Sequence, residues 1–146
     1  MPHFTFPASP DGYTLEVLIG LRAQAMQALQ AAGQPIPPPL RVRAILDTAS
    51  DTTAVAGRVL QHFGIPFSTT VQTHTAAGPI QVNVFTISLS VSDPIGVSRA
   101  MLVQPEWEVT EFLYPTPQIE VLIGLDLVNE CLLILDGPGR RFTLGF

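Results

Sequence analysis

The chain has 146 residues, of which 47% are hydrophobic and 13% are charged, and its formal net charge is −5 at pH 7. This length and hydrophobic content exclude a disordered chain and favour one domain with its own core. The acidic balance argues against a nucleic-acid partner, because phosphate backbones are bound mainly by Lys and Arg. No apolar run approaches the roughly eighteen residues of a membrane span, so no membrane association is predicted.

Two further features bear on compartment and cofactors. The first six residues lack the basic start and apolar centre of a signal peptide, and Cys131 is the sole cysteine, which excludes an internal disulfide. Both observations favour a cytoplasmic protein. The sequence has no phosphate-binding glycine loop and no His or Cys cluster at metal-ligand spacing. We therefore predict no cofactor and no metal.

The N-terminal third predicts a strand, a helix and a connector. Apolar residues alternate over 14–21, as in a strand, and then recur at helical spacing over 22–32. Residues 34–39 are rich in proline and are predicted to be a connector. We expect the whole of 1–39 to pack on a body formed by 40–146.

The next segment is predicted to be a strand followed by a helix. Residues 40–46 change from alternating to wholly apolar, as though a strand enters the core, and Asp47 follows directly. A helix is expected after Asp51, with Thr52 or Thr53 as its cap and Gly64 just beyond its end.

Residues 69–91 predict a long hairpin with its turn near 76–79. The parity of its apolar positions changes between Val84 and Phe85, which indicates a bulge or a strand that leaves one sheet for another. A projecting hairpin with a small, flexible tip suits a lid, although ordinary surface hairpins look the same.

The rest of the chain is predicted to be mostly short strands. The expected elements are a strand at 98–104, an irregular segment at 105–118, a strand at 119–123, a short helix capped by Asp126, and a closing hairpin over 132–146. Residues 120–125 repeat residues 16–21 letter for letter. The repeat indicates either an internal duplication or a coincidence between two short apolar strands.

Asp47 is the candidate acid–base group. It follows an apolar run, and a buried carboxylate is costly unless it is paired or hydrogen-bonded. Thr48 and Ser50 supply hydroxyl groups beside it. A carboxylate in such surroundings is a candidate for catalysis. The alternative is a strand end at which Asp47 or a threonine merely caps the next helix.

Four features occur in a particular order. They are Asp47-Thr48-Ala49-Ser50, a helix that ends in Phe63-Gly64-Ile65-Pro66, a glycine-tipped hairpin, and Val121-Leu122-Ile123-Gly124. This order resembles that of the retropepsin-like aspartic proteases, the single-lobed relatives of pepsin that include the retroviral enzymes. The resemblance implies a mainly β fold, a closed antiparallel barrel of a single lobe. It would carry one short helix after the apolar-apolar-Gly motif, one after the Asp-Thr-Ala motif and an inserted N-terminal helix.

The resemblance also implies an activity and its partners. The chain has only one Asp-Thr motif, so it would act as a homodimeric aspartic endopeptidase on a peptide or protein substrate, with Asp47 of each chain on the two-fold axis. Two neighbouring carboxylates do not both ionise easily, so they share a proton. One then acts as base toward a bound water, and the other donates to the scissile carbonyl.

Individual residues take roles by the same resemblance. Thr48 would lock the two catalytic loops across the dimer axis, and the Ser50 hydroxyl would hydrogen-bond the catalytic carboxylate. The residues implied to form or support the catalytic loop are Thr48, Ala49, Ser50, Val121, Leu122, Ile123 and Gly124. Those implied to contact substrate are Asp51 and the flap tip at Ala76, Ala77 and Gly78.

Two positions depart from the family pattern. Ala49 replaces the usual glycine, and its methyl group narrows the cleft floor. Leu125 stands where retroviral enzymes carry an Arg that pairs with the residue corresponding to Asp51. Asp51 must then pair with Arg140 or Arg141, or stay solvated.

Two other interpretations remain open. Ala49 is compatible with the same fold serving as a non-proteolytic dimerisation or peptide-binding module. The chain could also be an unrelated β-barrel domain in which Asp47 only caps a helix.

Overall fold

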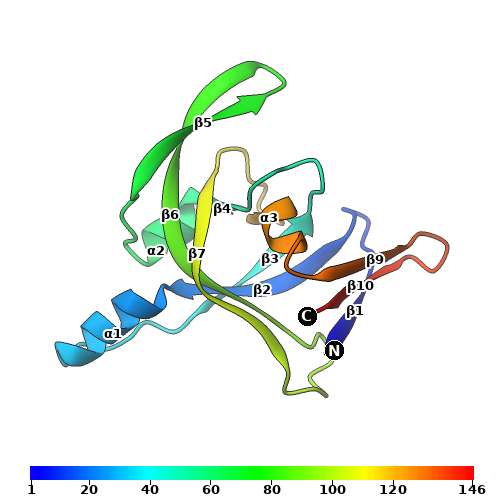
Figure 1. Ribbon diagram of the computed structural model, residues 1–146, viewed down its shortest axis with the longest axis horizontal. Helices are drawn as coiled ribbons and strands as arrows, with labels where there is room; N and C mark the ends of the chain where they lie inside the picture. The colour runs from blue at the N-terminus through cyan, green and yellow to red at the C-terminus, as the bar shows by residue number, and fades with distance from the viewer.

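The computed structural model describes residues 1–146 and contains ten strands and three helices (Figure 1). The strands are β1 (His3–Pro7), β2 (Thr14–Leu21), β3 (Leu40–Leu46), β4 (Ala54–Ala56), β5 (Thr69–Thr75), β6 (Gly78–Ser92), β7 (Met101–Phe112), β8 (Val121–Ile123), β9 (Leu132–Asp136) and β10 (Arg141–Gly145). The helices are α1 (Ala23–Ala31), α2 (Gly57–His62) and α3 (Leu125–Val128). None of the three combines the length and apolarity that a bilayer crossing requires.

Six strands close into a barrel. Their order is β2-β3-β8-β4-β7-β6, and β6 pairs back with β2 to complete the ring. Most neighbours are antiparallel, whereas β3–β8 and β4–β7 are parallel. Strand β5 lies outside the ring as an edge strand on β6. The prediction of a mainly β, closed and mostly antiparallel barrel with three short helices is confirmed.

The core lies inside the barrel and beneath a second, three-stranded sheet. Alternate residues of β2 and β6, such as Ile19 and Ile87, are fully buried because every second side chain of a strand faces the same way. The second sheet has the order β1-β10-β9. It buries Phe6 and Phe142, whose stacked rings have their centroids 5.0 Å apart.

Strand β6 exchanges neighbours where its apolar parity changes. It pairs with β5 as far as Val84 and with β2 from Ile87 onward. Val84 and Phe85 are consecutive and both buried, so the buried face switches between them. A strand that leaves one pairing for another, which was one of the two predicted explanations, accounts for this change.

Strand β7 continues well beyond its predicted end. The expectation that residues 105–118 are irregular is wrong as far as Phe112, because β7 runs to that residue. Pro105 lies where the β6–β7 register shifts between Ile87 and Leu89. At this bulge β7 has an extra residue that is unpaired with β6. The N–H that proline lacks is therefore not required for a hydrogen bond between the two strands.

The segment after Asp51 also differs from expectation. A short strand, β4, precedes the helix, and neither Thr52 nor Thr53 is its cap, since α2 begins only at Gly57. Tertiary pairing explains the difference, because β4 is held between β7 and β8. The end of the helix is as predicted, with Gly64 in the left-handed region at φ 62°.

Helix α1 projects from the barrel (Figure 1). None of its residues is fully buried, although Met26 shares a surface pocket with Leu18 and Pro37. It is attached at its N-terminal end by Glu106 of β7, which accepts hydrogen bonds from the Gln24 N–H at 2.8 Å and the Arg22 side chain at 2.6 Å. A carboxylate at this end satisfies a free helical N–H and favours the helix dipole.

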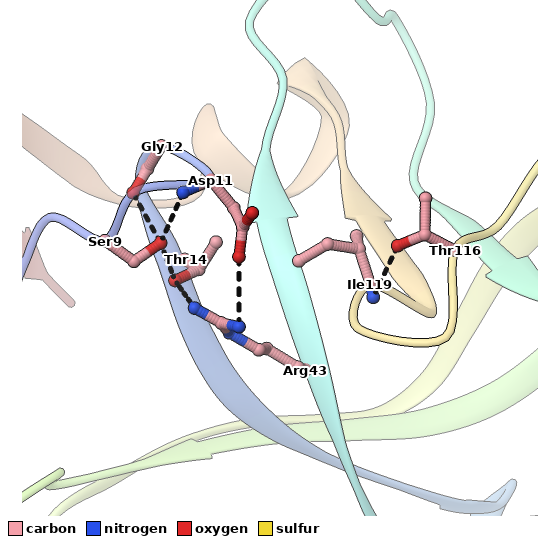
Figure 2. Close-up of polar contacts among 7 residues, drawn as sticks. All are labelled: Ser9, Asp11, Gly12, Thr14, Arg43, Thr116 and Ile119. Atoms are coloured by element: carbon pink, nitrogen blue, oxygen red, sulfur yellow. Dashed lines mark hydrogen bonds and ion pairs between the residues drawn. The ribbon is translucent and has the colours of Figure 1, made fainter.

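The turn between β1 and β2 is tied to β3 by a polar network (Figure 2). The Arg43 guanidinium donates to the Asp11 carboxylate at 3.2 Å and to the Thr14 hydroxyl at 3.1 Å. Thr14 in turn donates to the Ser9 hydroxyl at 3.0 Å. These contacts fix the middle of the strand that leads to Asp47.

The repeated segments 16–21 and 120–125 occupy non-equivalent places. Both contribute a strand beside β3, but β2 is antiparallel to it and β8 is parallel. Gly20 packs near Ser88, whereas Gly124 packs against the backbone of Thr52. The structure therefore gives the repeat no common structural role.

Candidate active site

Asp47 lies at the end of β3, in a loop that β8 supports from below. Strand β8 lies between β3, which enters this loop, and β4, which leaves it. The Asp47 N–H continues the β3–β8 ladder by donating to the Ile123 carbonyl at 2.9 Å. The two motifs singled out in the sequence, around Asp47 and around Ile123, are thus adjacent in space.

The loop forms a tight turn on the Asp47 side chain. The Ala49 N–H donates to the Asp47 Oδ1 atom at 3.0 Å, and the Ser50 N–H donates to the Asp47 carbonyl at 3.1 Å. Asp47 is half-buried, so its carboxylate is held by the backbone and still reaches solvent. A carboxylate held in this way is positioned for contact with a ligand in the adjoining space.

A second set of backbone bonds ties the loop to the start of α3. The Leu125 N–H donates to the Ser50 carbonyl at 2.8 Å, and the Asp126 N–H donates to the Asp51 carbonyl at 3.1 Å. These donors belong to the first turn of α3, where N–H groups have no partner within the helix. The loop therefore uses the free N–H groups of the helix as its anchor.

Gly124 permits the close approach between this helix and the loop. A Cβ atom at Gly124 would lie 2.5 Å from both the carbonyl carbon and the oxygen of Thr52. That separation is far inside van der Waals contact, so any side chain here would displace the loop. The glycine of the apolar-apolar-Gly motif is thus required by contact with the Asp47 loop.

Thr53 and Asp126 form a buried polar link that the sequence analysis did not anticipate. Thr53 is fully buried, and its hydroxyl donates to Asp126 Oδ1 at 2.8 Å while accepting from the Gly124 N–H at 3.2 Å. The same carboxylate oxygen accepts from the Leu127 N–H at 2.8 Å. The expectation that Asp126 caps α3 is wrong, because the N-cap is Gly124 and Asp126 lies in the first turn, where its carboxylate bonds the far end of the Asp47 loop. In the sequence, the one feature that could have indicated this link is a threonine that directly precedes an apolar strand.

Ser50 and Thr48 are the two hydroxyl residues of the Asp47 loop that the resemblance assigned to the catalytic site. Ser50 does not contact the Asp47 carboxylate; its hydroxyl donates instead to the Thr52 carbonyl at 2.8 Å. The Ser50 hydroxyl proton is used by this carbonyl, so the expected bond is not formed within one chain. Thr48 is exposed at the tip of the turn.

Ala49 is accommodated without backbone strain. Arg140 is the only non-glycine residue with positive φ, so Ala49 does not occupy a conformation that requires glycine. Its methyl group is exposed beside Asp47. The substitution changes the shape of the surface above the loop and leaves the loop conformation intact.

A cleft of about 530 Å³ adjoins the Asp47 loop on the side of the β5–β6 hairpin. In Figure 1 this hairpin projects from the barrel at the top of the view. The lining residues are Asp47, Ala49, Ser50, Asp51, Thr52, Val71, Gln72, Thr73, His74, Thr75, Thr110 and Leu122. Strand β5, which the sequence analysis did not assign to the site, therefore contributes one wall.

The hairpin tip lies outside this cleft. The turn is where it was predicted, with Thr75 paired to Gly78 and Gly78 in a glycine conformation at φ 116°. The Thr75 hydroxyl donates to the Gly78 carbonyl at 2.9 Å and closes the turn. Ala76, Ala77 and Gly78 do not line the cleft of the single chain.

Asp51 has no cationic partner. The two arginines proposed for it lie elsewhere, and Arg141 donates to Asp136 at 2.8 Å. The Gly139 N–H and then Arg141 lower the pKa of Asp136. None of the ion pairs of the chain includes Asp51 or Arg140, so of the two expected alternatives the structure has the second, in which the carboxylate of Asp51 stays solvated.

Cys131 has the character of a core residue. It is partly buried and lines an apolar space with Leu46 and Ile123. Desolvation, and to a lesser extent the nearby Glu130 charge, raise the pKa of its thiol. A raised pKa disfavours the thiolate, so Cys131 is not poised as a nucleophile.

No protein-family model and no curated protein matches the sequence. Among solved structures, the chain is similar to a retropepsin-like aspartic protease from Rickettsia conorii, with a TM-score of 0.60. The chain has a retropepsin-like fold. The aligned part covers 98% of this chain and 90% of that protein at 12% sequence identity, so the likeness concerns the fold alone. Within this retropepsin-like fold, Asp47 lines the cleft, and Gly124 lies buried against the Thr52 backbone of the same loop.

Proposed function

We propose that the chain is one protomer of a homodimeric aspartic endopeptidase whose catalytic pair consists of Asp47 from each copy. The observation that carries this proposal is the Asp47 loop, which is held by β8 and by the Gly124 approach and opens onto a cleft of about 530 Å³. The retropepsin-like fold, shared with a protein described as an aspartic protease, supports the same reaction class.

The proposed reaction follows from two carboxylates that share one proton. The ionised Asp47 removes a proton from a bound water as the water oxygen attacks the scissile carbonyl carbon. The protonated Asp47 of the other copy donates its proton to the carbonyl oxygen, which gives a tetrahedral diol. Collapse of the diol breaks the C–N bond while a proton passes to the amine.

Other residues take supporting roles in this proposal. Thr48, exposed at the tip of the turn, would bond the facing loop of the second copy. The hairpin tip at 76–78 would close over an extended peptide, which would lie along the free edge of β5 as an added strand. Asp51 would contact the substrate beyond the scissile bond.

Ala49 favours a second candidate function. Its methyl group is exposed beside the carboxylate where a substrate backbone would approach. A chain that binds an extended peptide in the cleft but does not cleave it would be a dimerisation or peptide-binding module of the same fold.

Incubation of the full chain with a diverse peptide pool, over a range of acidic to neutral pH, tests the proposal. Cleavage should be present in the wild type and absent in Asp47→Asn. Glu130→Gln provides a control that removes one exposed charge outside the cleft and should leave cleavage unchanged. Equal cleavage by wild type and Asp47→Asn would refute the role of Asp47.

Sizing in solution tests the dimer on which the protease proposal depends. A strictly monomeric protein at all concentrations would refute the protease, because one chain supplies a single Asp47. A protein that binds peptides without cleaving them would support the binding module.

A further inference from the structure

We infer that the cleft selects peptides with a Lys or Arg side chain near the scissile bond, and that Asp51 binds this side chain. The inference rests on the proposed function and names the substrate class of the same cleft. It starts from the carboxylate of Asp51, which lines the cleft, is exposed, and forms no ion pair within the chain.

The backbone of Asp51 is fixed while its side chain is free. The Asp51 carbonyl accepts the Asp126 N–H at 3.1 Å, which holds the residue against the start of α3. No intramolecular hydrogen bond uses its carboxylate, in contrast to Asp47, whose Oδ1 accepts the Ala49 N–H. A positioned carboxylate with all its acceptor sites available suits a charge-assisted bond from an incoming ligand.

No cation of the chain competes for this carboxylate. The sequence contains no lysine, and five of its seven arginines are already paired with carboxylates elsewhere. Neither of the other two, Arg99 and Arg140, lines the cleft. A cation for Asp51 must therefore come from outside the chain.

The cleft as a whole is negatively charged. Its only titratable side chains are Asp47, Asp51 and His74, and the remaining polar groups are hydroxyls and an amide. With a neutral histidine the cleft is therefore negative, and the two copies of a dimer would double this charge. Such a cleft attracts cationic peptides and disfavours acidic ones.

The position of Asp51 limits where the basic side chain lies. Asp51 is four residues beyond Asp47, a length of chain that spans at most about 14 Å. An extended peptide advances about 3.3 Å per residue. The basic residue therefore lies within about four residues of the scissile bond, and by two-fold symmetry this holds on either side.

A cleavage assay on matched peptides tests the inference. The peptides carry Lys, norleucine or Glu at each position in turn, and kcat/KM is measured at neutral pH, within the range over which cleavage is tested and above the ordinary pKa of an aspartate or histidine side chain. An exposed ion pair contributes at most about fivefold. The wild type should prefer Lys over norleucine by about two- to fivefold at one or more positions. Asp51→Asn should abolish the preference, and Asp51→Lys should favour Glu.

The controls separate this inference from the proposed function. Glu130→Gln, which removes a charge outside the cleft, should retain the preference for Lys. Cleavage without a preference, or a preference that persists in Asp51→Asn, would overturn the inference and leave the protease intact. If the wild type cleaves nothing, fluorescence anisotropy with the Lys and norleucine peptides decides the matter. Tighter binding of Lys that Asp51→Asn removes supports the inference, and equal or absent binding overturns it.

Discussion

The link between Thr53 and Asp126 makes a quantitative prediction. Thr53→Val keeps the shape of the side chain and removes only the hydroxyl, which is fully buried and forms two hydrogen bonds. A hydrogen bond to a charged group contributes about 1.5–3 kcal/mol, and a buried N–H left unpaired, here that of Gly124, costs about 1–3 kcal/mol. Because the Gly124 bond is long at 3.2 Å, we take the lower part of these ranges and expect a loss of about 3 kcal/mol in the free energy of unfolding.

Thr53→Ser is the matched variant. It keeps both hydrogen bonds and removes one buried methyl group, which costs about 1 kcal/mol. At this chain length each kcal/mol lowers Tm by roughly 2–4 °C. Thr53→Val should therefore melt roughly 6–12 °C below the wild type, and Thr53→Ser well above Thr53→Val. The measurement is thermal and urea unfolding at a fixed protomer concentration, because dimer formation makes Tm depend on concentration. A Thr53→Val protein as stable as Thr53→Ser would show that the hydroxyl does not hold the loop.

Three further changes test other parts of the site and fold. Gly124→Ala places a Cβ atom 2.5 Å from the backbone of Thr52, so we expect a loss of about 1–3 kcal/mol, and an unchanged urea midpoint would contradict this. Ala49→Gly should raise kcat/KM for peptide cleavage by admitting the substrate backbone more closely, while unfolding free energy falls by about 0.4–1 kcal/mol; a lower kcat/KM would count against this reasoning. The Ser98 N–H, followed by other backbone donors, lowers the pKa of Asp93 from 3.8, so its contribution to stability is complete above 3.8 and is lost as pH falls through the lowered value. Acid unfolding should therefore show a weaker pH dependence in Asp93→Asn than in the wild type, and identical profiles would refute the assignment.

Local sequence patterns predicted several elements correctly. The alternation along 14–21 and the apolar run up to Asp47 identified two barrel strands, because each pattern records which faces of a strand are buried. Gly64 and the turn near Gly78 were predicted from the backbone conformations that glycine allows, and both have positive φ. The proximity of Asp47 to Gly124 was predicted from the resemblance to the retropepsin-like aspartic proteases, in which the two motifs occur in the same order.

Other features depend on contacts between distant parts of the chain. Strand β7 continues past Pro105 because a bulge opposite β6 removes the need for a proline N–H, which no local pattern reveals. Helix α1 has an amphipathic sequence, yet it projects from the barrel (Figure 1) and none of its residues is fully buried. Local periodicity indicates which face of an element is apolar, but not whether another element covers it.

The same division applies to the candidate site. The residues around Asp47 indicate this site by themselves, since an apolar run that ends in a carboxylate with hydroxyl neighbours is unusual for a plain strand. The tertiary structure decides that Thr53 bonds Asp126, that β5 forms a wall of the cleft, and that Asp51 has no cation. The physical reason is that a polar side chain takes its role from the partner that satisfies it. These partners come from segments far apart in the sequence and meet only when the barrel closes.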